Sequence, residues 1–202
     1  MWLLFAELTA AIASDLYRYR GRANRSDLIS AFIYEPGFRY MFYLRKAAYY
    51  RQRRILFLIP LIYNRLMLKH YRHYYGFQLY PSTRVGCGLY LGHFGTIIVN
   101  SKAVLGDNVN LAPGVVIGQA NRGKRKGIPT IGNRVWIGSN AVLVGNIRVG
   151  DDALIGPGAY VNFDVPERAV VIGNPGSIVS YSGAEDYVCN LAPSASQKPR
   201  SS

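Results

Sequence analysis

Cysteine is scarce in this sequence of 202 residues, in which only Cys87 and Cys189 occur. Two thiols without paired spacing exclude a disulfide framework and a cysteine-based zinc site, so we expect a reducing compartment, the cytoplasm. Long apolar runs are also missing. The longest, residues 55–63, is far shorter than the roughly 20 residues that span a bilayer. The apolar start lacks the basic flank of a secretory signal, so we expect neither a transmembrane segment nor a leader.

Acidic residues are also few. The chain carries 24 Lys and Arg against 11 Asp and Glu, which gives a formal net charge of +13, and most of the excess lies in residues 1–84. Such a charge favours an anionic partner. The candidates are a phosphorylated ligand, a membrane surface and nucleic acid. The uneven distribution also indicates two regions with different roles.

Apolar residues recur at every sixth position in the second half of the chain. The positions are Ile131, Ile137, Leu143, Val149, Ile155 and Val161, and the same spacing occurs upstream at Val99, Leu105, Leu111 and Ile117. The fourth residue after most of these is also apolar and compact. A period of six fits neither an α-helix nor one long strand, because glycines interrupt the strand at each repeat. Three hexads close one triangular coil around the aliphatic column, so the repeat predicts a parallel β-helix.

Two breaks in the repeat are candidates for function, since loops on a rigid scaffold carry sites. The first break adds two residues within 92–96 and contains His93, the single histidine of the repeat region. The second is a long loop over residues 118–127 that also departs from the sixfold phase. Its cations are Arg122, Lys124, Arg125 and Lys126. This charge makes the long loop a candidate clamp for an anion.

The first 78 residues follow a helical pattern. Ser26 and Asp27 are typical of a cap before a helix over residues 28–34, and the spacing of apolar residues predicts helices over 38–54 and 55–75. Pro60 falls near the start of the last helix or kinks it. We therefore divide the chain into three parts, which are a basic, Tyr-rich helical region (1–78), a repeat domain (79–182) and a disordered tail (183–202).

The repeat motifs resemble those of a known family. They are residues 105–109, 131–133, 136–141 and 149–153 with the closing turn 171–175, and residues 14–16 and 34–38 match upstream. These motifs resemble the hexapeptide-repeat acyltransferases of the serine acetyltransferase type, in a shortened form similar to polysaccharide O-acetyltransferases. The resemblance implies a mainly β fold, namely a left-handed parallel β-helix with an N-terminal α-helical region. It also implies a homotrimer or a dimer of trimers, active sites between subunits, acetyl-CoA as donor and no metal.

His93 matches the catalytic histidine of that family, and the resemblance implies that it is the general base. A neutral imidazole with a pKa of about 6.5 takes a proton from the attacking hydroxyl and returns it to the departing thiolate. Three positions depart from the serine enzymes. Gln78 replaces a carboxylate that orients the histidine, Gly92 replaces an acid that holds the amino group of serine, and Ile128 replaces a second histidine. These changes count against L-serine as the acceptor.

For the donor, the resemblance assigns the pantetheine arm to Gly118, Gly138, Ser139 and Pro157. A serine stands where a basic residue usually follows the closing turn, so Arg122 and Lys124 become candidates for the nucleotide phosphates. A solvated loop whose cations only keep it soluble is the alternative. On the acceptor side, the candidates are Tyr90, Gly92 and Phe94, which flank the catalytic histidine.

The sequence therefore predicts an acetyl-CoA-dependent O-acetyltransferase. The acceptor that we expect is a sugar hydroxyl of a surface or capsular polysaccharide or its precursor, because the serine-binding positions are changed. Serine O-acetyltransferase activity, a step towards cysteine, is one alternative, and a non-catalytic trimeric scaffold is another. Arg51, Arg53, Arg54 and residues 55–63 also predict a peripheral contact with the inner face of a membrane. We do not expect nucleic acid as a partner.

Overall fold

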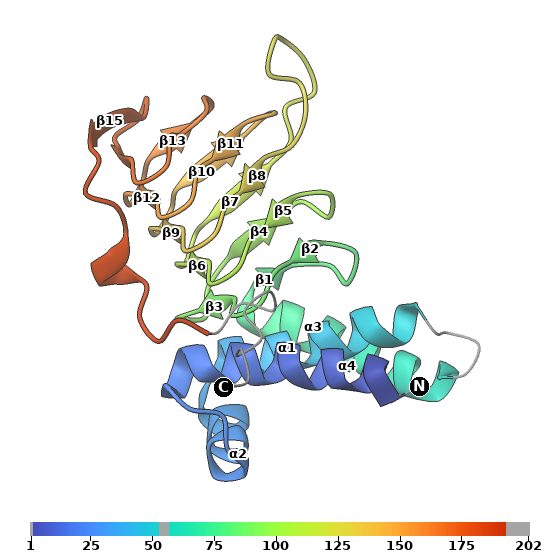
Figure 1. Cartoon of the computed structure of the whole chain (residues 1–202). Coiled ribbons are helices and arrows are strands. Elements are labelled where there is room, and N and C mark those ends of the chain that lie inside the picture. The colour runs from blue at the N-terminus through green and yellow to red at the C-terminus, as the bar shows by residue number, and fades with distance from the viewer. Residues whose placement is uncertain (1, 53–56, 193–202) are drawn as a thin grey trace.

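The structure is a computed structural model that describes residues 2–52 and 57–192, and the side chains of 5–52 and 57–192. Four helices come first, and short strands follow (Figure 1). The helices are α1 (Trp2–Arg20), α2 (Arg25–Tyr34), α3 (Pro36–Arg51) and α4 (Leu58–Tyr75). None of the helices within the described ranges is long and apolar enough to span a bilayer.

The strands form three parallel sheets, which are the three sides of a prism. Sheet A contains β1 (Phe77–Gln78), β4 (Ile97–Val99), β7 (Val116–Gly118), β10 (Val142–Val144) and β13 (Tyr160–Val161). Sheet B contains β2 (Arg84–Val85), β5 (Val104–Leu105), β8 (Thr130–Ile131) and β11 (Arg148–Val149). Sheet C contains β3 (Tyr90–Leu91), β6 (Asn110–Leu111), β9 (Trp136–Ile137), β12 (Leu154–Ile155), β14 (Val170–Ile172) and the antiparallel β15 (Ser177–Ser180). The fold is a left-handed parallel β-helix with N-terminal helices, as predicted.

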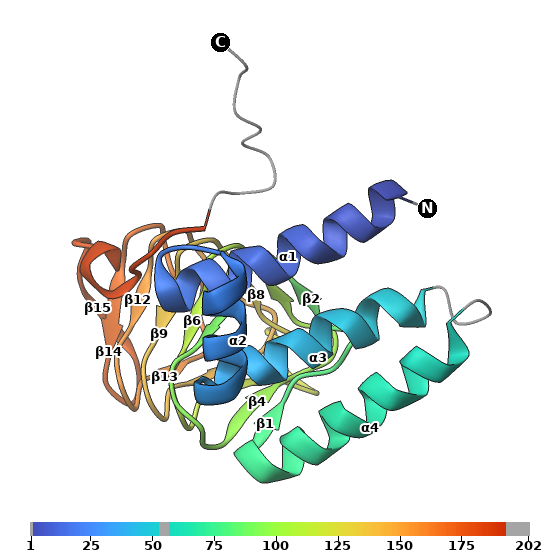
Figure 2. The same cartoon turned by 90° about the horizontal axis from the view of Figure 1, so that it is seen from below.

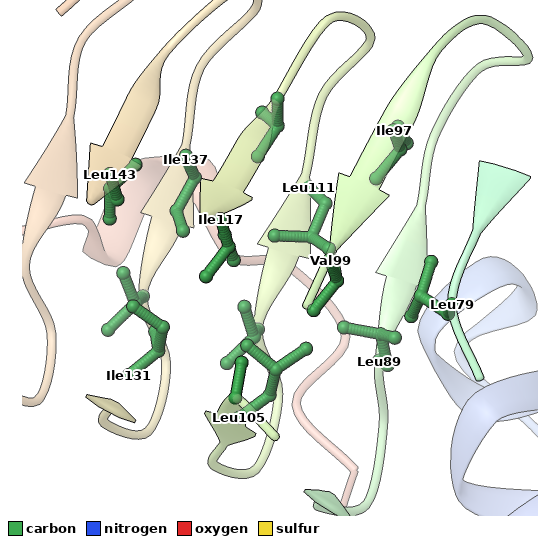
Figure 3. Packing of buried hydrophobic residues seen from close by; sticks show 14 of the residues in the cluster. Leu79, Leu89, Ile97, Val99, Leu105, Leu111, Ile117, Ile131, Ile137 and Leu143 are labelled. Atoms are coloured by element: carbon green, nitrogen blue, oxygen red, sulfur yellow. The ribbon is translucent and has the colours of Figure 1, made fainter. Parts of the chain in front are cut away.

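The sixfold phase sets the register of the strands. Leu105 pairs with Ile131, Ile117 with Leu143, and the same hexad position recurs in each coil. Every predicted inward aliphatic residue from Val99 to Val161 is buried. Figure 3 shows those from Val99 to Leu143 stacked inside the prism. Burial of this continuous column is the main driving force for coil stacking. The first coil begins at Phe77, two residues before the predicted domain boundary.

The helices differ from their predictions at the ends. The N-cap of α2 is Asn24, whose side chain accepts a hydrogen bond from the N–H of Asp27, so the predicted cap at Ser26 and Asp27 lies inside the helix. The helix predicted over 38–54 is α3, and the helix predicted over 55–75 is α4, with Pro60 in its first turn. Residues 53–56 lie outside the described residues.

Helix α1 was not predicted, because its buried face contains charged residues as well as apolar ones. Leu16 lies on this face together with Asp15 and Arg18, and all three are buried against the rest of the molecule. A helix whose inward positions include an acid and a base lacks a clean apolar stripe. Figure 2 shows α1, α3 and α4 lying across the end of the prism, so these helices cover the first coil.

The C-terminal residues 183–192 form a strap that runs back along the coils. Each coil takes one strand from each sheet in chain order, so the first coil is β1–β3, the second is β4–β6 and the fourth is β10–β12. Ala184 donates its N–H to the carbonyl of Asp152 in the fourth coil, and Asn110 in the second coil donates to the carbonyl of Tyr187. Ala192 exchanges two hydrogen bonds with Asn108, also in the second coil. Asn190 then donates to the carbonyl of Arg18 in α1 at 3.3 Å. The prediction of a disordered tail is therefore wrong for these residues, and residues 193–202 lie outside the described residues.

Candidate active site

The turn that carries His93 joins β3 to β4 at the corner between sheets C and A. Its backbone is fixed on two sides. Gly95 donates to the carbonyl of Tyr75 at the end of α4 at 2.9 Å, and the carbonyl of Thr96 accepts from Gly114 in the next coil at 2.6 Å. Gly95 has a φ of +137°, a conformation that L side chains rarely adopt, and a Cβ there would lie 3.1 Å from Pro113. The result is a rigid turn with an exposed imidazole.

The His93 side chain makes no hydrogen bond or ion pair with any described residue of its own chain. Gln78, predicted to orient the imidazole, lies on β1 in register with Ile98 and donates its amide to the Tyr80 hydroxyl at 2.8 Å. The predicted contact between Gln78 and His93 is therefore absent from the described chain, because Tyr80 holds the amide instead. An orienting role for Gln78 stays a prediction. Sequence reasoning missed Tyr80, although a residue two positions along a strand lies on the same side.

Three of the residues predicted to bind the acetyl donor lie in one column with His93. The turns between sheets C and A stack coil upon coil, because Asn140 donates to Pro113 at 2.9 Å and Gly158 donates to Ser139 at 2.8 Å. Gly138, Ser139 and Pro157 belong to these turns, above the His93 turn. Gly138 is needed for this stacking, since a Cβ would lie 2.8 Å from the backbone nitrogen of Pro157.

The turn 112–114 stands between the His93 turn and the turn of Ser139, and it was not among the predicted site residues. The signal for it was present in the repeat. Leu111 and Ile137 occupy the same hexad position in consecutive coils and pair in sheet C. The residues that follow each of them must therefore fall in the same column.

The other residues predicted to bind the acetyl donor lie at a different corner of the prism. Gly118 ends β7, at the corner between sheets A and B, and the long loop that follows contains Arg122 and Lys124 (Figure 1). This loop closes as a hairpin with two backbone hydrogen bonds between Ala120 and Gly127, each of 3.0 Å. Within one chain, the strands of sheet A separate the loop from the His93 column.

The charges of the long loop are only partly paired. Arg125 donates to Asp164 at 2.6 Å, and this hydrogen bond lowers the pKa of the Asp164 carboxyl. Arg122 and Lys124 are exposed and have no ion pair among the described residues. The loop therefore presents unpaired positive charge to solvent, which is the property that a phosphate site requires.

The three predicted acceptor residues have different surroundings. Phe94 is 70% exposed, beside His93 at the tip of the turn. Gly92 packs against the ring of Tyr90, and a Cβ at Gly92 would lie 2.9 Å from that ring. The Tyr90 ring in turn contacts Tyr19 of α1 with a centroid distance of 4.6 Å, and burial raises the pKa of its hydroxyl. Tyr90 is thus part of the contact between α1 and the coil.

No group of metal-binding side chains occurs within the described ranges. Cys87 is half-buried, and burial raises the pKa of its thiol, which disfavours the thiolate.

Part of the repeat region matches a known family model. Residues 128–162 match the family model described as "Bacterial transferase hexapeptide (six repeats)", in agreement with the stacked hexads of the structure. Several curated proteins that resemble this chain are serine acetyltransferases. One from Synechococcus elongatus is 32% identical over 148 residues, which are 73% of this chain and 59% of that protein. One from Mycobacterium tuberculosis is 35% identical over 107 residues, which are 53% of this chain and 47% of that protein.

Solved structures agree over a larger part of the chain. Neisseria gonorrhoeae serine acetyltransferase in complex with serine superposes with a TM-score of 0.70 and 28% identity, over 88% of this chain and 71% of that chain. Soybean serine acetyltransferase complexed with serine gives a TM-score of 0.72 and 26% identity, over 86% and 70%. The chain spans about three fifths of the length of the Synechococcus relative, from the 59% coverage.

Proposed function

We propose that this protein is an O-acetyltransferase that moves the acetyl group of acetyl-CoA to the hydroxyl of L-serine, with His93 as general base. The observation that carries the proposal is the exposed imidazole of His93 on a rigid turn, in one column with Gly138, Ser139 and Pro157. Similarity to serine acetyltransferases supports both the reaction and the acceptor. The sugar hydroxyl that the sequence predicts has no support from these relatives.

The chemistry needs one proton carrier and no covalent enzyme intermediate. The imidazole accepts the proton of the serine hydroxyl while the oxygen forms a bond to the thioester carbonyl carbon. Backbone N–H groups of the His93 turn are candidates to stabilise the oxyanion. When the carbon–sulfur bond breaks, the imidazolium returns the proton to the thiolate. The products are O-acetylserine and coenzyme A, so atoms and charges balance.

We further propose that the site is shared between subunits of a homotrimer. In one chain, the long loop with Arg122 and Lys124 and the His93 column lie at different corners of the prism. A neighbouring subunit that packs against sheet A would bring its own loop to the His93 corner. The two cations then meet the nucleotide phosphates, while the pantetheine arm follows the turns of Gly138 and Pro157.

A sugar hydroxyl is the second candidate acceptor, and one feature favours it. No Asp or Glu occurs between Glu35 and Asp107, a stretch that includes the whole His93 turn and Gln78. The turn therefore offers no carboxylate to the ammonium group of an amino acid, whereas a neutral sugar needs only hydrogen bonds and a stacking surface such as Phe94.

The proposal is tested by thiol release from acetyl-CoA with the purified protein, with and without L-serine. We expect stimulation by serine, and a loss of kcat/KM of about 10²–10⁴-fold in His93→Asn. The matched control is His73→Asn, which changes an exposed histidine of α4 and should keep full activity. Slow thiol release that depends on His93 but not on serine would favour the sugar acceptor. No thiol release and no binding of acetyl-CoA would favour the non-catalytic scaffold.

The shared site has a separate test, which is co-expression of two defective chains. One carries His93→Asn and the other carries Arg122→Gln and Lys124→Gln. If sites form between subunits, mixed trimers contain some sites with both intact parts and regain activity. The control places all three substitutions in every chain and should stay inactive. Absence of recovery in mixed trimers of the expected mass would contradict a shared site.

A further inference from the structure

Helix α4 has an apolar face that the described residues leave about half exposed or more. Its first half carries large hydrophobic side chains at helical spacing, and Ile59 is 82% exposed. The other members of this apolar face are Leu58, Ile62, Tyr63 and Leu66, which are 49–60% exposed. A group of exposed apolar side chains of this kind marks a contact with a partner or a membrane.

A cationic cavity adjoins this apolar face. It has a volume of about 750 Å³ and lies between α3, α4 and the turn 80–82. Ile62 and Leu66 belong to both the apolar face and the cavity wall. The charged residues of the wall are Arg51, Arg65, Lys69 and Arg72, and the wall contains no acid. The surface is therefore amphiphilic, with positive charge directly beside exposed hydrocarbon.

The charges of this cavity are not neutralised within the described chain. None of its four cations has an ion pair with a described residue. The guanidinium of Arg72 lies over the ring of Tyr80, 4.7 Å from the centroid, and its Nε is buried without a hydrogen-bond partner among the described residues. A buried donor without a partner costs stability, and the Nε of Arg72 is such a donor.

The apolar face and the cavity together define the chemistry of the occupant. A second copy of the chain would bring like charges together across a symmetric contact, which is unfavourable. Nucleic acid would satisfy the cations but leave Ile59 and Leu66 in water. We propose that α4 and its cavity dock on an anionic lipid membrane, with lipid phosphates in the cavity and the apolar face in the headgroup boundary.

This docking surface is joined to the candidate active site through α4 itself. The helix ends at Tyr75, whose carbonyl holds Gly95, and Gly76 accepts from Ile97 at 3.1 Å. Docking of α4 therefore fixes the position of the His93 turn relative to the bilayer. The proposal needs no particular acceptor and is independent of the proposed reaction.

The experiment is co-sedimentation of the full chain with two kinds of vesicle at low salt. One kind is pure phosphatidylcholine, and the other contains about 30% phosphatidylglycerol. We expect binding to the anionic vesicles, at least about tenfold weaker binding to phosphatidylcholine, and a loss of binding as salt rises. Absence of binding to anionic vesicles at low salt would overturn the proposal.

Two double variants separate the two parts of the surface. Arg65→Gln with Lys69→Gln removes charge, and Ile59→Ser with Leu66→Ser removes exposed hydrocarbon. We expect each pair to weaken vesicle binding by about tenfold or more. All four side chains are exposed, so the variants should fold, which circular dichroism checks.

The matched control is Arg84→Gln with Lys102→Gln, two exposed cations of the coil that should be neutral for vesicle binding. His93→Asn should also bind vesicles like the unmodified chain, which separates docking from catalysis. Equal losses in the control and the Arg65/Lys69 pair would reduce the effect to net charge and contradict a defined surface. An assembly in solution that dissociates with Ile59→Ser and Leu66→Ser, without vesicle binding, would assign the face to a second copy.

Discussion

The coil and the helical region are stabilised in different ways. In the coil, one hexad repeats, each strand pairs with its copy in the next coil, and the interior is mainly aliphatic. The helical region has no repeat. Residues of α3 such as Met41 and Leu44 belong to the same buried apolar cluster as the coil interior, and specific polar contacts between residues far apart in the sequence are added to this packing. The coil shares its stability among many equivalent contacts, whereas the polar contacts of the helical region are few and differ from each other.

The first coil is the place where the two regions meet. Its outer strands have no preceding coil, so their backbone groups need other partners. The Tyr19 hydroxyl pairs with the N–H and carbonyl of Leu91, both at 3.1 Å, and the Tyr40 hydroxyl does the same for Leu79 at 3.2 and 2.8 Å. Side chains of the helices thus complete the open edge of the β-helix.

The largest expected effect is the loss of the buried ion pair within the helical region, whose two side chains also hydrogen-bond to the backbone of the first coil. Asp15 of α1 binds Arg45 of α3 through two hydrogen bonds of 2.9 Å and also accepts the N–H of Leu89. Asp15→Ala should lower the free energy of unfolding by about 3–5 kcal/mol, because Arg45 remains buried and unpaired. Urea denaturation measures this loss. Asp186→Ala, at an exposed position, is the control, and an equally small change in both variants would contradict the contrast between regions.

The next effect lies in the aliphatic column of the coil. Ile137→Ala should cost about 2–5 kcal/mol, because a cavity opens in a fully buried position, while Ile137→Val should cost about 0.5–1.5 kcal/mol. Denaturation curves of both variants give the comparison. If Ile137→Ala lowers the free energy of unfolding by no more than Ile137→Val, the coil relaxes around the cavity and is less rigid than its regular packing indicates.

A smaller effect is expected at the edge contacts made by tyrosine. Tyr19→Phe and Tyr40→Phe each leave two backbone groups of a leucine without a partner, so each should cost about 1–3 kcal/mol. Tyr74→Phe is the control, since Tyr74 is 74% exposed. Thermal unfolding of the three variants distinguishes them. Equal melting temperatures for all three would show that water replaces the hydroxyls at the edge.

The smallest effect concerns pH and the long loop. The hydrogen bond from Arg125 lowers the pKa of Asp164 below its usual 3.8. Its stabilisation is therefore complete above about pH 4 and is lost as pH falls through the lowered pKa. The pair is exposed, so the effect should stay below about 1 kcal/mol. Unfolding profiles of the unmodified chain and Asp164→Asn should converge at low pH. Profiles that stay parallel down to pH 2 would exclude this linkage.

Sequence reasoning succeeded where the signal is local and periodic. The hexad predicts the coil, its register and its buried positions, because each strand repeats the environment of the one before it. The helices α3 and α4 follow from apolar spacing, with errors only at their ends. The left-handed β-helix was implied by the family resemblance and is confirmed.

Sequence reasoning failed where contacts join residues that are far apart in the sequence. The burial of Asp15 in α1 depends on Arg45 and on the backbone of Leu89, which no local pattern reveals. The strap residues 183–192 follow no repeat, and their position depends on distant contacts, namely hydrogen bonds with Asn108 and Asn110 and the burial of Ala184 and Val188 against Leu154. At the site, the distance between the two corners of the prism follows from the three-sided geometry, and the bond from Gln78 to Tyr80 depends on side-chain rotamers.

The strap has a consequence for how the protein unfolds. An array of stacked repeats ordinarily frays from its terminal coil, one unit at a time. Here the strap leaves the last coil, touches the fourth and second coils and reaches Arg18 of the helical region. The last coil therefore cannot detach without also releasing contacts at the opposite end. Opening becomes a concerted event, and amide hydrogens of the terminal coils should exchange with the same slow kinetics as those of the central ones.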